Sequence, residues 1–252
     1  MRLAIADLDE YYDRVSKDRD IPELKLGVPH PRLFPHPTKF TEYAAKANER
    51  KQIEFEYIDQ PSIGPNNVTF IAKVKSSDRK LVIKFVERYG VEAHKLLADK
   101  GMAPRLLYCG LLDGENDVRD GQGQVQGSIG GGGLYIGSVR MVVMDYIEGS
   151  TFDKAPRLPE DTRTQIKTAI DTLHEKQLVF GDLRPPNVMI SKNGDKVYLI
   201  DFDWSGKVDE ARYPLHLSRS VNWPDQPKNL ELKLILTTHD DFMLDQLFQF
   251  SH

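Results

Sequence analysis

The chain has little cysteine, little net charge and no long apolar run, and each shortage excludes a class of protein. A single cysteine, Cys109, among 252 residues rules out an intrachain disulfide framework and favours a reducing compartment. The net charge of -4 gives no general attraction to nucleic acid or to anionic membranes. No apolar run approaches the ~20 residues of a membrane-spanning helix. We therefore expect an intracellular protein, cytoplasmic or nuclear, that binds neither nucleic acid nor membranes.

The residues that are present indicate a globular protein with an N-terminal extension. Hydrophobic residues make up 40% and charged residues 29% of the chain, which is enough for a packed core. Residues 1–45 are the predicted extension, because the four prolines of VPHPRLFPHP exclude regular structure there. Residues 40–50, at its end, have helical spacing. We expect Cys109 to be a small buried residue rather than a nucleophile.

Residues 46–148 have the pattern of an antiparallel sheet. Residues 53–57 alternate as in a strand with one buried face, and the apolar segments 68–74, 80–86, 105–109 and 139–144 are interpreted as further strands, which predicts five strands. One helix is predicted at 92–100. Residues 110–137 hold ten of the 18 glycines and predict a flexible insertion.

Residues 149–252 have a mainly helical pattern. Helices are predicted from 158 to about 178 and from 240 to 250, and the KNGD turn joins two short strands at 188–190 and 197–200. The composition changes at 145–149, which we interpret as a hinge. Together the two halves predict an α+β protein.

The chemistry concentrates in the segments FGDLRPPNVMI and VYLIDFDW. Asp182 and Asn187 are five residues apart, and Asp201 follows at the end of an apolar strand. Phosphoryl transfer needs a carboxylate that takes the proton of a hydroxyl, and oxygen ligands for Mg²⁺. Two aspartates and an asparagine in adjacent loops supply both. Taken one at a time, Asp182, Asp201 and Asp203 are equally well explained as turn residues.

At these segments the chain resembles the protein-kinase superfamily. GDLRPPN is similar to the catalytic loop, IDFD to the metal-binding loop, LVIKF to the strand with the phosphate-binding lysine, and VVMDYIEG to the hinge. The motifs VIKFVERYG, APRLL, FGDLRPPNV, LIDFDW and RYP further resemble a kinase-like family abundant in mushroom-forming fungi. The resemblance implies a two-lobed fold with a five-stranded antiparallel N-lobe sheet and one helix (46–148), and a shortened, mainly helical C-lobe (149–252).

The resemblance also implies roles for the residues of the two loops. Asp182 corresponds to the catalytic base, and Asn187 and Asp201 to the ligands of Mg²⁺. Arg184 stands where serine/threonine kinases usually have lysine, and a guanidinium there would steady the γ-phosphate of ATP. Asp240 resembles the aspartate that anchors the catalytic-loop backbone from a later helix.

The nucleotide-binding residues follow from the same resemblance. Lys84 would hold the phosphates, with Glu92 of the next helix as its ion-pair partner, although Glu87 competes for that place. Met144 corresponds to the gatekeeper. The backbone groups of Asp145 and Ile147 would bind adenine.

Three departures separate this sequence from ordinary kinases. The turn PSIGPNN replaces the glycine-rich loop, so that Gly64 alone allows close approach to phosphate. Gly181 replaces the arginine before the catalytic aspartate, as in small-molecule kinases of the aminoglycoside and choline type. Only 51 residues follow Asp201, too few for the usual protein-substrate platform.

Two hypotheses therefore remain open from the sequence. The first is an ATP- and Mg²⁺-dependent phosphotransferase that acts on a hydroxyl of an unidentified protein or small-molecule acceptor. The second is a catalytically weak or inactive pseudokinase that serves as a nucleotide-binding or protein-interaction module. Intact Lys84, Asp182, Asn187 and Asp201 favour the first, and the three departures favour the second.

Overall fold

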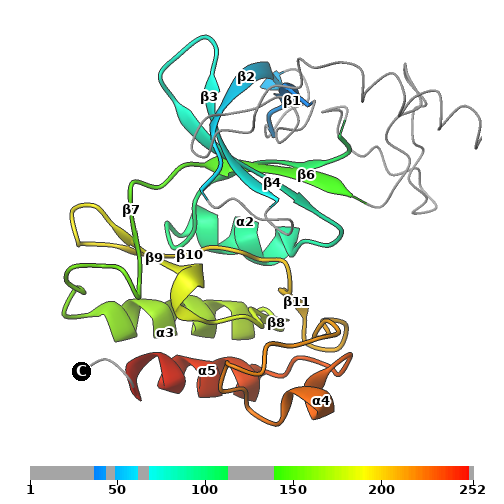
Figure 1. Ribbon diagram of the computed structural model, residues 1–252, viewed down its shortest axis with the longest axis vertical. Coiled ribbons are helices and arrows are strands. Elements are labelled where there is room, and N and C mark those ends of the chain that lie inside the picture. Colours follow the sequence, from blue (N-terminus) through cyan, green and yellow to red (C-terminus); the bar gives the residue numbers. More distant parts are fainter. Residues whose placement is uncertain (1–36, 44–48, 62–67, 113–138, 250–252) are drawn as a thin grey trace, which may run out of the picture. The chain divides into compact units, whose positions relative to one another are not determined.

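The computed structural model describes residues 37–43, 49–61, 68–112 and 139–249. The chain divides into two units, Met1–Pro35 and His36–His252, and every described residue belongs to the second. Most of the predicted extension and of the glycine-rich stretch 110–137 thus lies outside the described residues. The described part is α+β with antiparallel sheets, as the sequence predicts (Figure 1).

Among the described residues the larger sheet has six strands in the order β1-β2-β3-β4-β6-β5, and each neighbouring pair is antiparallel. Its strands are β1 (Lys39–Thr41), β2 (Gln52–Asp59), β3 (Thr69–Val74), β4 (Lys80–Val86), β5 (Leu106–Gly110) and β6 (Arg140–Asp145). Each of the five predicted strands is present. The predicted count of five is wrong, because β1 adds a sixth.

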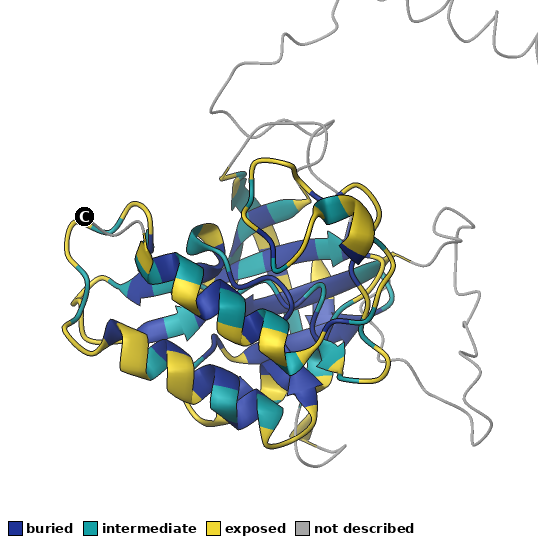
Figure 2. Ribbon diagram, turned by 90° about the horizontal axis from the view of Figure 1, so that it is seen from below, coloured by how far each residue is buried: buried dark blue, intermediate teal, exposed yellow. Residues whose placement is uncertain are grey.

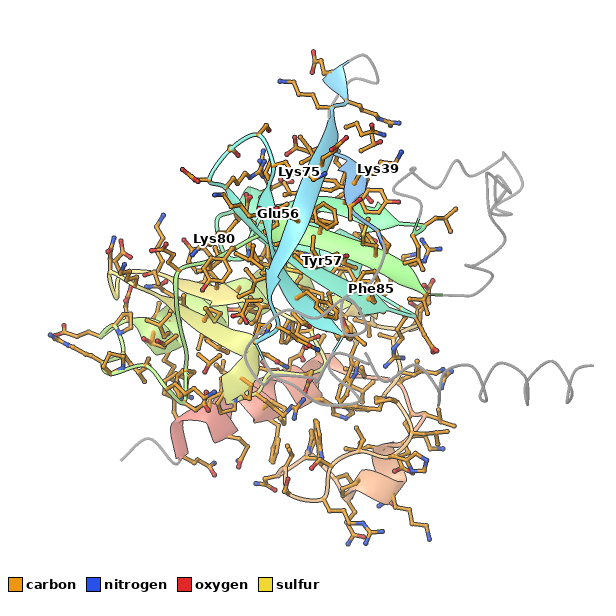
Figure 3. The ribbon with its side chains drawn as sticks, turned by 45° about the horizontal axis from the view of Figure 1, so that its top comes forward. Lys39, Glu56, Tyr57, Lys75, Lys80 and Phe85 are labelled. Atoms are coloured by element: carbon orange, nitrogen blue, oxygen red, sulfur yellow. The ribbon has the colours of Figure 1, made fainter. Side chains whose placement is uncertain are left out.

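Strand β1 lies where the sequence predicted a helix. Its Phe40 is fully buried and packs against Phe55 and Tyr108, each with a ring-centroid distance of 6.0 Å. The burial of this ring against the sheet outweighs the local helical spacing. Further along the sheet, the ring centroid of Phe70 lies 5.6 Å from that of Tyr57 and 6.0 Å from that of Phe85, the two aromatic side chains labelled in Figure 3. Residues 44–48 lie outside the described part.

Helix α2 (Val91–Asp99) lies between the six-stranded sheet and the helical half of the protein (Figure 1). Its His94 is fully buried and stacks on Phe202, with ring centroids 4.4 Å apart. His94 Nε2 donates to the carbonyl of Pro104 at 2.7 Å, and Nδ1 accepts from the Tyr89 hydroxyl at 2.8 Å. This arrangement uses the neutral imidazole, because only that form has one donor and one acceptor nitrogen.

The burial of His94 predicts a loss of stability in mild acid. Burial lowers the pKa of His94 to about 4, so below the ordinary histidine pKa the unfolded chain binds a proton that the folded chain does not. Between about pH 7 and about pH 5 we expect this residue to remove about 2 kcal/mol of unfolding free energy. Urea denaturation at both pH values measures the change. A His94→Leu variant with the same pH dependence as the wild type would contradict the assignment.

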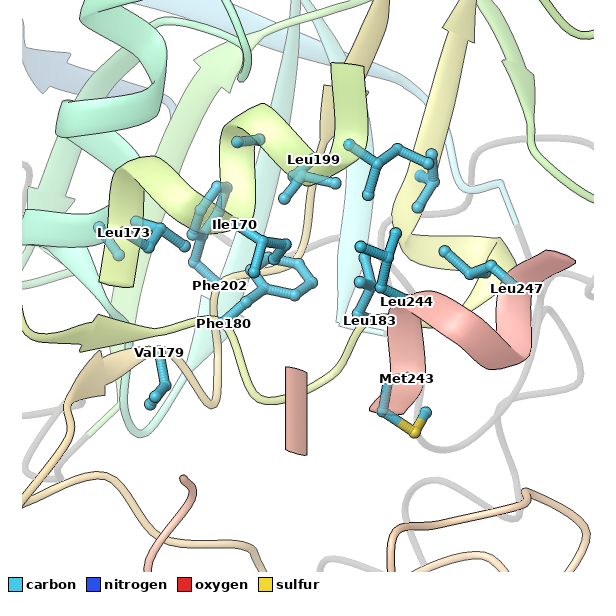
Figure 4. Packing of buried hydrophobic residues seen from close by; sticks show 14 of the residues in the cluster. Ile170, Leu173, Val179, Phe180, Leu183, Leu199, Phe202, Met243, Leu244 and Leu247 are labelled. Carbon is cyan, nitrogen blue, oxygen red and sulfur yellow. The ribbon is translucent and has the colours of Figure 1, made fainter. Parts of the chain in front are cut away.

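The helical half is built on α3 (Thr162–His174) and α5 (Thr237–Gln249), which pack together. Their buried faces show as dark blue segments between exposed ones in Figure 2. Ile170 and Leu173 of α3 lie in the same cluster as Phe180 and Phe202 of the loops and Leu244 of α5 (Figure 4). The remaining elements are β7 (Gly149–Thr151), β8 (Leu178–Val179), η2 (Pro185–Asn187), β9 (Val188–Ser191), β10 (Val197–Leu199), β11 (Gly206–Lys207) and α4 (Pro227–Leu230).

Two details of the helical half bear on the predictions. The KNGD hairpin is confirmed, because β9 and β10 pair antiparallel on either side of it. Helix α3 begins at Thr162 and not at Leu158, since the carbonyl of Pro159 accepts both the backbone N–H of Thr162 at 3.1 Å and its hydroxyl at 2.7 Å. That turn takes the place of the first predicted helical turn.

The structure bears on two expectations, the burial of the single cysteine and the lack of a membrane-spanning helix. Cys109 is buried in β5, as expected for a core residue. Across the described ranges, no helix combines the length and the apolar composition needed to cross a bilayer.

Candidate active site

The loop that carries Asp182 is held by Asp240 of α5. Asp240 is 1% exposed, and its two carboxylate oxygens accept the backbone N–H groups of Phe180 and Gly181, each at 2.8 Å. His174 of α3 lies 3.2 Å from the same carboxylate. The predicted anchoring role of Asp240 is confirmed. It ties the catalytic loop to two helices of the core.

Gly181 allows the chain to turn immediately before Asp182. Its φ of +86° lies in the region that favours glycine, and a Cβ there would approach Ile235 Cδ1 to 2.7 Å. An arginine at this position, as in most protein kinases, would meet both problems. The positive φ therefore favours glycine over arginine at this position.

Asp182 is buried and fully engaged by two side chains. Arg184 donates Nε to Oδ1, and Nη2 to Oδ2 at 2.6 Å, while Asn187 Nδ2 donates to Oδ2 at 2.9 Å. Burial raises the pKa of Asp182, and the charge of Arg184 opposes that rise. A carboxylate with a raised pKa accepts a proton more readily, which suits a general base.

The guanidinium of Arg184 lies beside two neighbouring tryptophan rings, whose centroids are 5.8 Å apart. Its central carbon is 5.9 Å from the ring centroid of Trp204 and 5.7 Å from that of Trp223. Such cation–π contacts stabilise a positive charge next to an apolar surface. Trp204 belongs to a motif visible in the sequence, but Trp223 could not be found from the sequence, because 39 residues separate it from Arg184 and only the fold brings them together.

Lys84 of β4 connects the sheet to the loop after β10. Its Nζ lies 2.7 Å from Asp201 Oδ1 and 2.7 Å from Asp203 Oδ2. Burial opposes the charge of Lys84, but the two carboxylates outweigh it and raise the pKa of this lysine. Burial, and then the charge of Asp201, raise the pKa of Asp203 to about 7. Asp201 itself adopts a φ of +68°, an uncommon conformation that turns the loop towards Lys84.

The structure does not bring Glu92 to Lys84. Glu92 is exposed in the first turn of α2, whereas Lys84 is 7% exposed and is paired with Asp201 and Asp203. The prediction of an ion pair between Lys84 and Glu92 is therefore wrong. Asp203, for which the sequence offered only a possible turn role, takes that position, and its only sequence signal was a second acid two residues after Asp201.

An apolar cavity of about 270 Å³ adjoins Lys84 and Asp201. Met144, Asp145 and Ile147 of the hinge segment line it, as expected for an adenine site. Its other lining residues are Pro61, Thr69, Ile71, Val82, Tyr146, Met189 and Ile200. The Asp145 N–H donates to the carbonyl of Arg105 at 3.1 Å, and within the described part of the chain the Ile147 N–H has no backbone partner. Gly64 lies outside the described residues.

The oxygen donors near the cavity fit a magnesium ion. Asn187 supplies an amide oxygen, and Asp201 a carboxylate that is 36% exposed. Asp203 Oδ1 is buried with no hydrogen-bond partner among the described residues. In that same part of the chain no three His, Cys, Asp or Glu side chains form a metal-binding group. Mg²⁺ usually binds one or two protein carboxylates and completes its shell with phosphates and water, so this donor set suits it.

Comparisons with known proteins point to kinases. Residues 134–224 match the model of the family described as lipopolysaccharide core biosynthesis protein (WaaY). The chain is 33% identical over 82 residues to a cAMP-dependent protein kinase type 3 of Saccharomyces cerevisiae. It is 31% identical over 70 residues to the lipopolysaccharide core heptose(II) kinase WaaY of Escherichia coli.

These sequence matches are partial. They cover 29% and 28% of this chain, and 20% and 29% of the yeast and bacterial kinases. A shorter match, 36% identical over 55 residues, relates the chain to a putative serine/threonine-protein kinase of Acanthamoeba polyphaga mimivirus. Together the matches support the protein-kinase superfamily.

A solved structure shows the fold. The Cydia pomonella granulovirus kinase PK-1 superposes with a TM-score of 0.52 at 16% identity. The superposition covers 75% of this chain and 65% of the viral one. The chain therefore has a protein-kinase-like fold.

Proposed function

We propose that this chain is an ATP- and Mg²⁺-dependent phosphotransferase that moves the γ-phosphate of ATP to a hydroxyl group. The observation that carries the proposal is two pairs of contacting side chains, of which one, Lys84 and Asp201, lines the apolar cavity. Lys84 contacts Asp201, and Asn187 contacts Asp182. The Ile200 N–H donates to the carbonyl of Asn187 at 3.0 Å, which fixes the two loops side by side.

Each side chain has a defined task in this proposal. Adenine occupies the cavity against the hinge, where the carbonyl of Asp145 and the N–H of Ile147 bind its edge. Lys84 binds the phosphates. Asp182 orients the acceptor hydroxyl and takes its proton as the phosphoryl group leaves ATP. Asn187 and Asp201 would hold Mg²⁺, which would supply positive charge beside the phosphates.

Arg184 has to change partners during this reaction. In the structure its guanidinium covers both carboxylate oxygens of Asp182. We propose that the γ-phosphate draws Arg184 away from Asp182, because a guanidinium binds phosphate in the same two-pronged geometry as carboxylate. Trp204 and Trp223 would stay in contact with the guanidinium.

The acceptor belongs to one of two classes, a protein or a small molecule. The similar proteins include protein kinases and a heptose(II) kinase, so a protein hydroxyl and a sugar hydroxyl are both candidates. We further propose, from the resemblance of its motifs, that the chain belongs to the kinase-like family of mushroom-forming fungi. A panel with both acceptor types and radiolabelled ATP separates the two classes.

A second candidate function is a nucleotide-binding module without catalysis. The observation in its favour is the closed contact between Arg184 and Asp182, which occupies the base. Binding of Mg-ATP without phosphate transfer to any acceptor or to water would favour this candidate over the enzyme.

Nucleotide binding is tested by thermal stability. Mg-ATP at about 100 times its dissociation constant is expected to stabilise the wild-type protein by about 2.7 kcal/mol. Asp201→Ala is expected to abolish the part of this gain that depends on Mg²⁺, because it removes the carboxylate ligand. Asp209→Ala, at an exposed acid in the same segment, is the matched control. A wild-type protein that Mg-ATP does not stabilise would refute both candidate functions.

A further inference from the structure

We propose that Asp203 is the positioning residue of Lys84, in the place that a carboxylate of α2 was expected to fill. The inference rests on the proposed function, since it concerns how the phosphate-binding lysine is held. Its consequence is that the partner of Lys84 comes from the same loop as the metal ligand Asp201, and not from a helix. The geometry on both sides of Lys84 supports it.

Lys84 has three N–H donors, and two of them are already directed at carboxylates. Asp201 and Asp203 accept from Nζ at 2.7 Å each. When Asp201 turns to a metal ion, Asp203 remains, among the described residues, as the carboxylate that holds the ammonium group in place. The donors then released face the phosphates. Without Asp203, the lysine would lose its last negative partner at the moment when the nucleotide binds.

Helix α2 is fastened to this loop by packing and not by charge. His94 stacks on Phe202, the residue between the two aspartates, at an interplanar angle of 5°. The Gly90 N–H donates to the carbonyl of Phe202 at 2.8 Å. A Cβ on Gly90 would lie 2.6 Å from the carbonyl oxygen of Ser205, so glycine permits this close approach. Helix α2 thus holds the loop through close packing, while the Glu92 side chain is exposed to solvent.

Asp203 has a rival role as a second metal ligand. Its Oδ1 is buried and has no hydrogen-bond partner among the described residues, so it could also reach a cation. The two roles predict different results when Lys84 is removed. A positioning residue acts only through Lys84, whereas a metal ligand acts without it.

Calorimetric titration of ATP, with and without Mg²⁺, tests the proposal on the full chain. Asp203→Asn is expected to weaken Mg-ATP binding about tenfold, the usual effect of losing a hydrogen bond to a charged group. Binding of metal-free ATP is expected to stay the same or tighten, because Asp201 still holds Lys84 and one negative charge near the phosphates is gone. Retained metal-free binding also shows that the variant is folded. Asp203→Ala provides a second, smaller neutral variant.

Two further variants assign the effect. In the Lys84→Met background, Asp203→Asn is expected to change Mg-ATP binding by less than about twofold, since both residues act as one unit. Glu92→Gln is expected to stay within about twofold of the wild type, because its carboxylate is exposed.

Four results would overturn the inference. One is unchanged Mg-ATP binding in Asp203→Asn although the wild type binds, and another is equal weakening with and without metal. The third is a tenfold loss in Glu92→Gln, and the fourth is a full additional loss in the Lys84→Met background, which would make Asp203 a metal ligand. A wild type that does not bind Mg-ATP would refute the proposed function itself, and the inference with it.

Discussion

Asp182→Asn is expected to lower kcat for phosphate transfer about 1,000-fold, within the range found for loss of a general base. The asparagine keeps the shape of the side chain and can still accept from Asn187, so the loop is expected to stay in place. Binding of Mg-ATP is expected to persist or tighten, because Arg184 is freed for the phosphates. Single-turnover kinetics with labelled ATP, beside a binding titration, measures both quantities.

The control for this variant is an acid of the same type outside the site. Asp209→Asn replaces an exposed carboxylate in the segment after Asp201 and is expected to leave kcat unchanged. If Asp182→Asn retained the wild-type rate, Asp182 would not be the base. If Asp182→Asn lost nucleotide binding as well as turnover, its role would be to build the site.

Asp240→Ala is expected to cost the fold about 3 kcal/mol, because it leaves two buried backbone N–H groups without their acceptor. In a protein of this size that corresponds to a fall in Tm of about 6–12 °C. The carboxylate accepts the backbone N–H groups of Phe180 and Gly181, directly before Asp182. Activity is therefore expected to fall further than the loss of stability alone explains. Thermal denaturation and turnover at a temperature where the variant is folded measure the two effects.

Asp241 gives a matched control on the same helix. It is the next residue of α5 and is exposed, so Asp241→Ala is expected to change stability by less than about 0.5 kcal/mol. Equal losses in the two variants would mean that helix α5 as a whole, and not the carboxylate of Asp240, stabilises the protein.

The sequence predicted the elements whose pattern is local. Strand β4 has the predicted bounds, Lys80–Val86, because it is a short run of mostly β-branched and aromatic residues. The hairpin of β9 and β10 was predicted from the KNGD turn, whose glycine adopts a φ of +69°. Asp240 could be assigned because its position matched a family pattern. The signals for β4 and for the hairpin each lie within a few consecutive residues.

The sequence failed where distant segments decide the outcome. β1 is a strand because Phe40 fits between Phe55 and Tyr108, and the latter is 68 residues away. The ion pair of Lys84 was assigned to the nearest acid of the next helix, but the fold brings in an acid 119 residues later. Electrostatic partners are chosen by three-dimensional proximity, and the spacing of residues along the chain does not contain that information.

The most direct test of the account is a crystal structure of the full chain with Mg²⁺ and a non-hydrolysable ATP analogue. The account predicts adenine in the cavity lined by Val82, Met144 and Ile147, and a metal ion on Asn187 and Asp201. It also predicts a γ-phosphate that faces Asp182, with Arg184 moved from the carboxylate to the phosphate. A nucleotide bound elsewhere, or one whose γ-phosphate is separated from Asp182 by an unmoved Arg184, would contradict it.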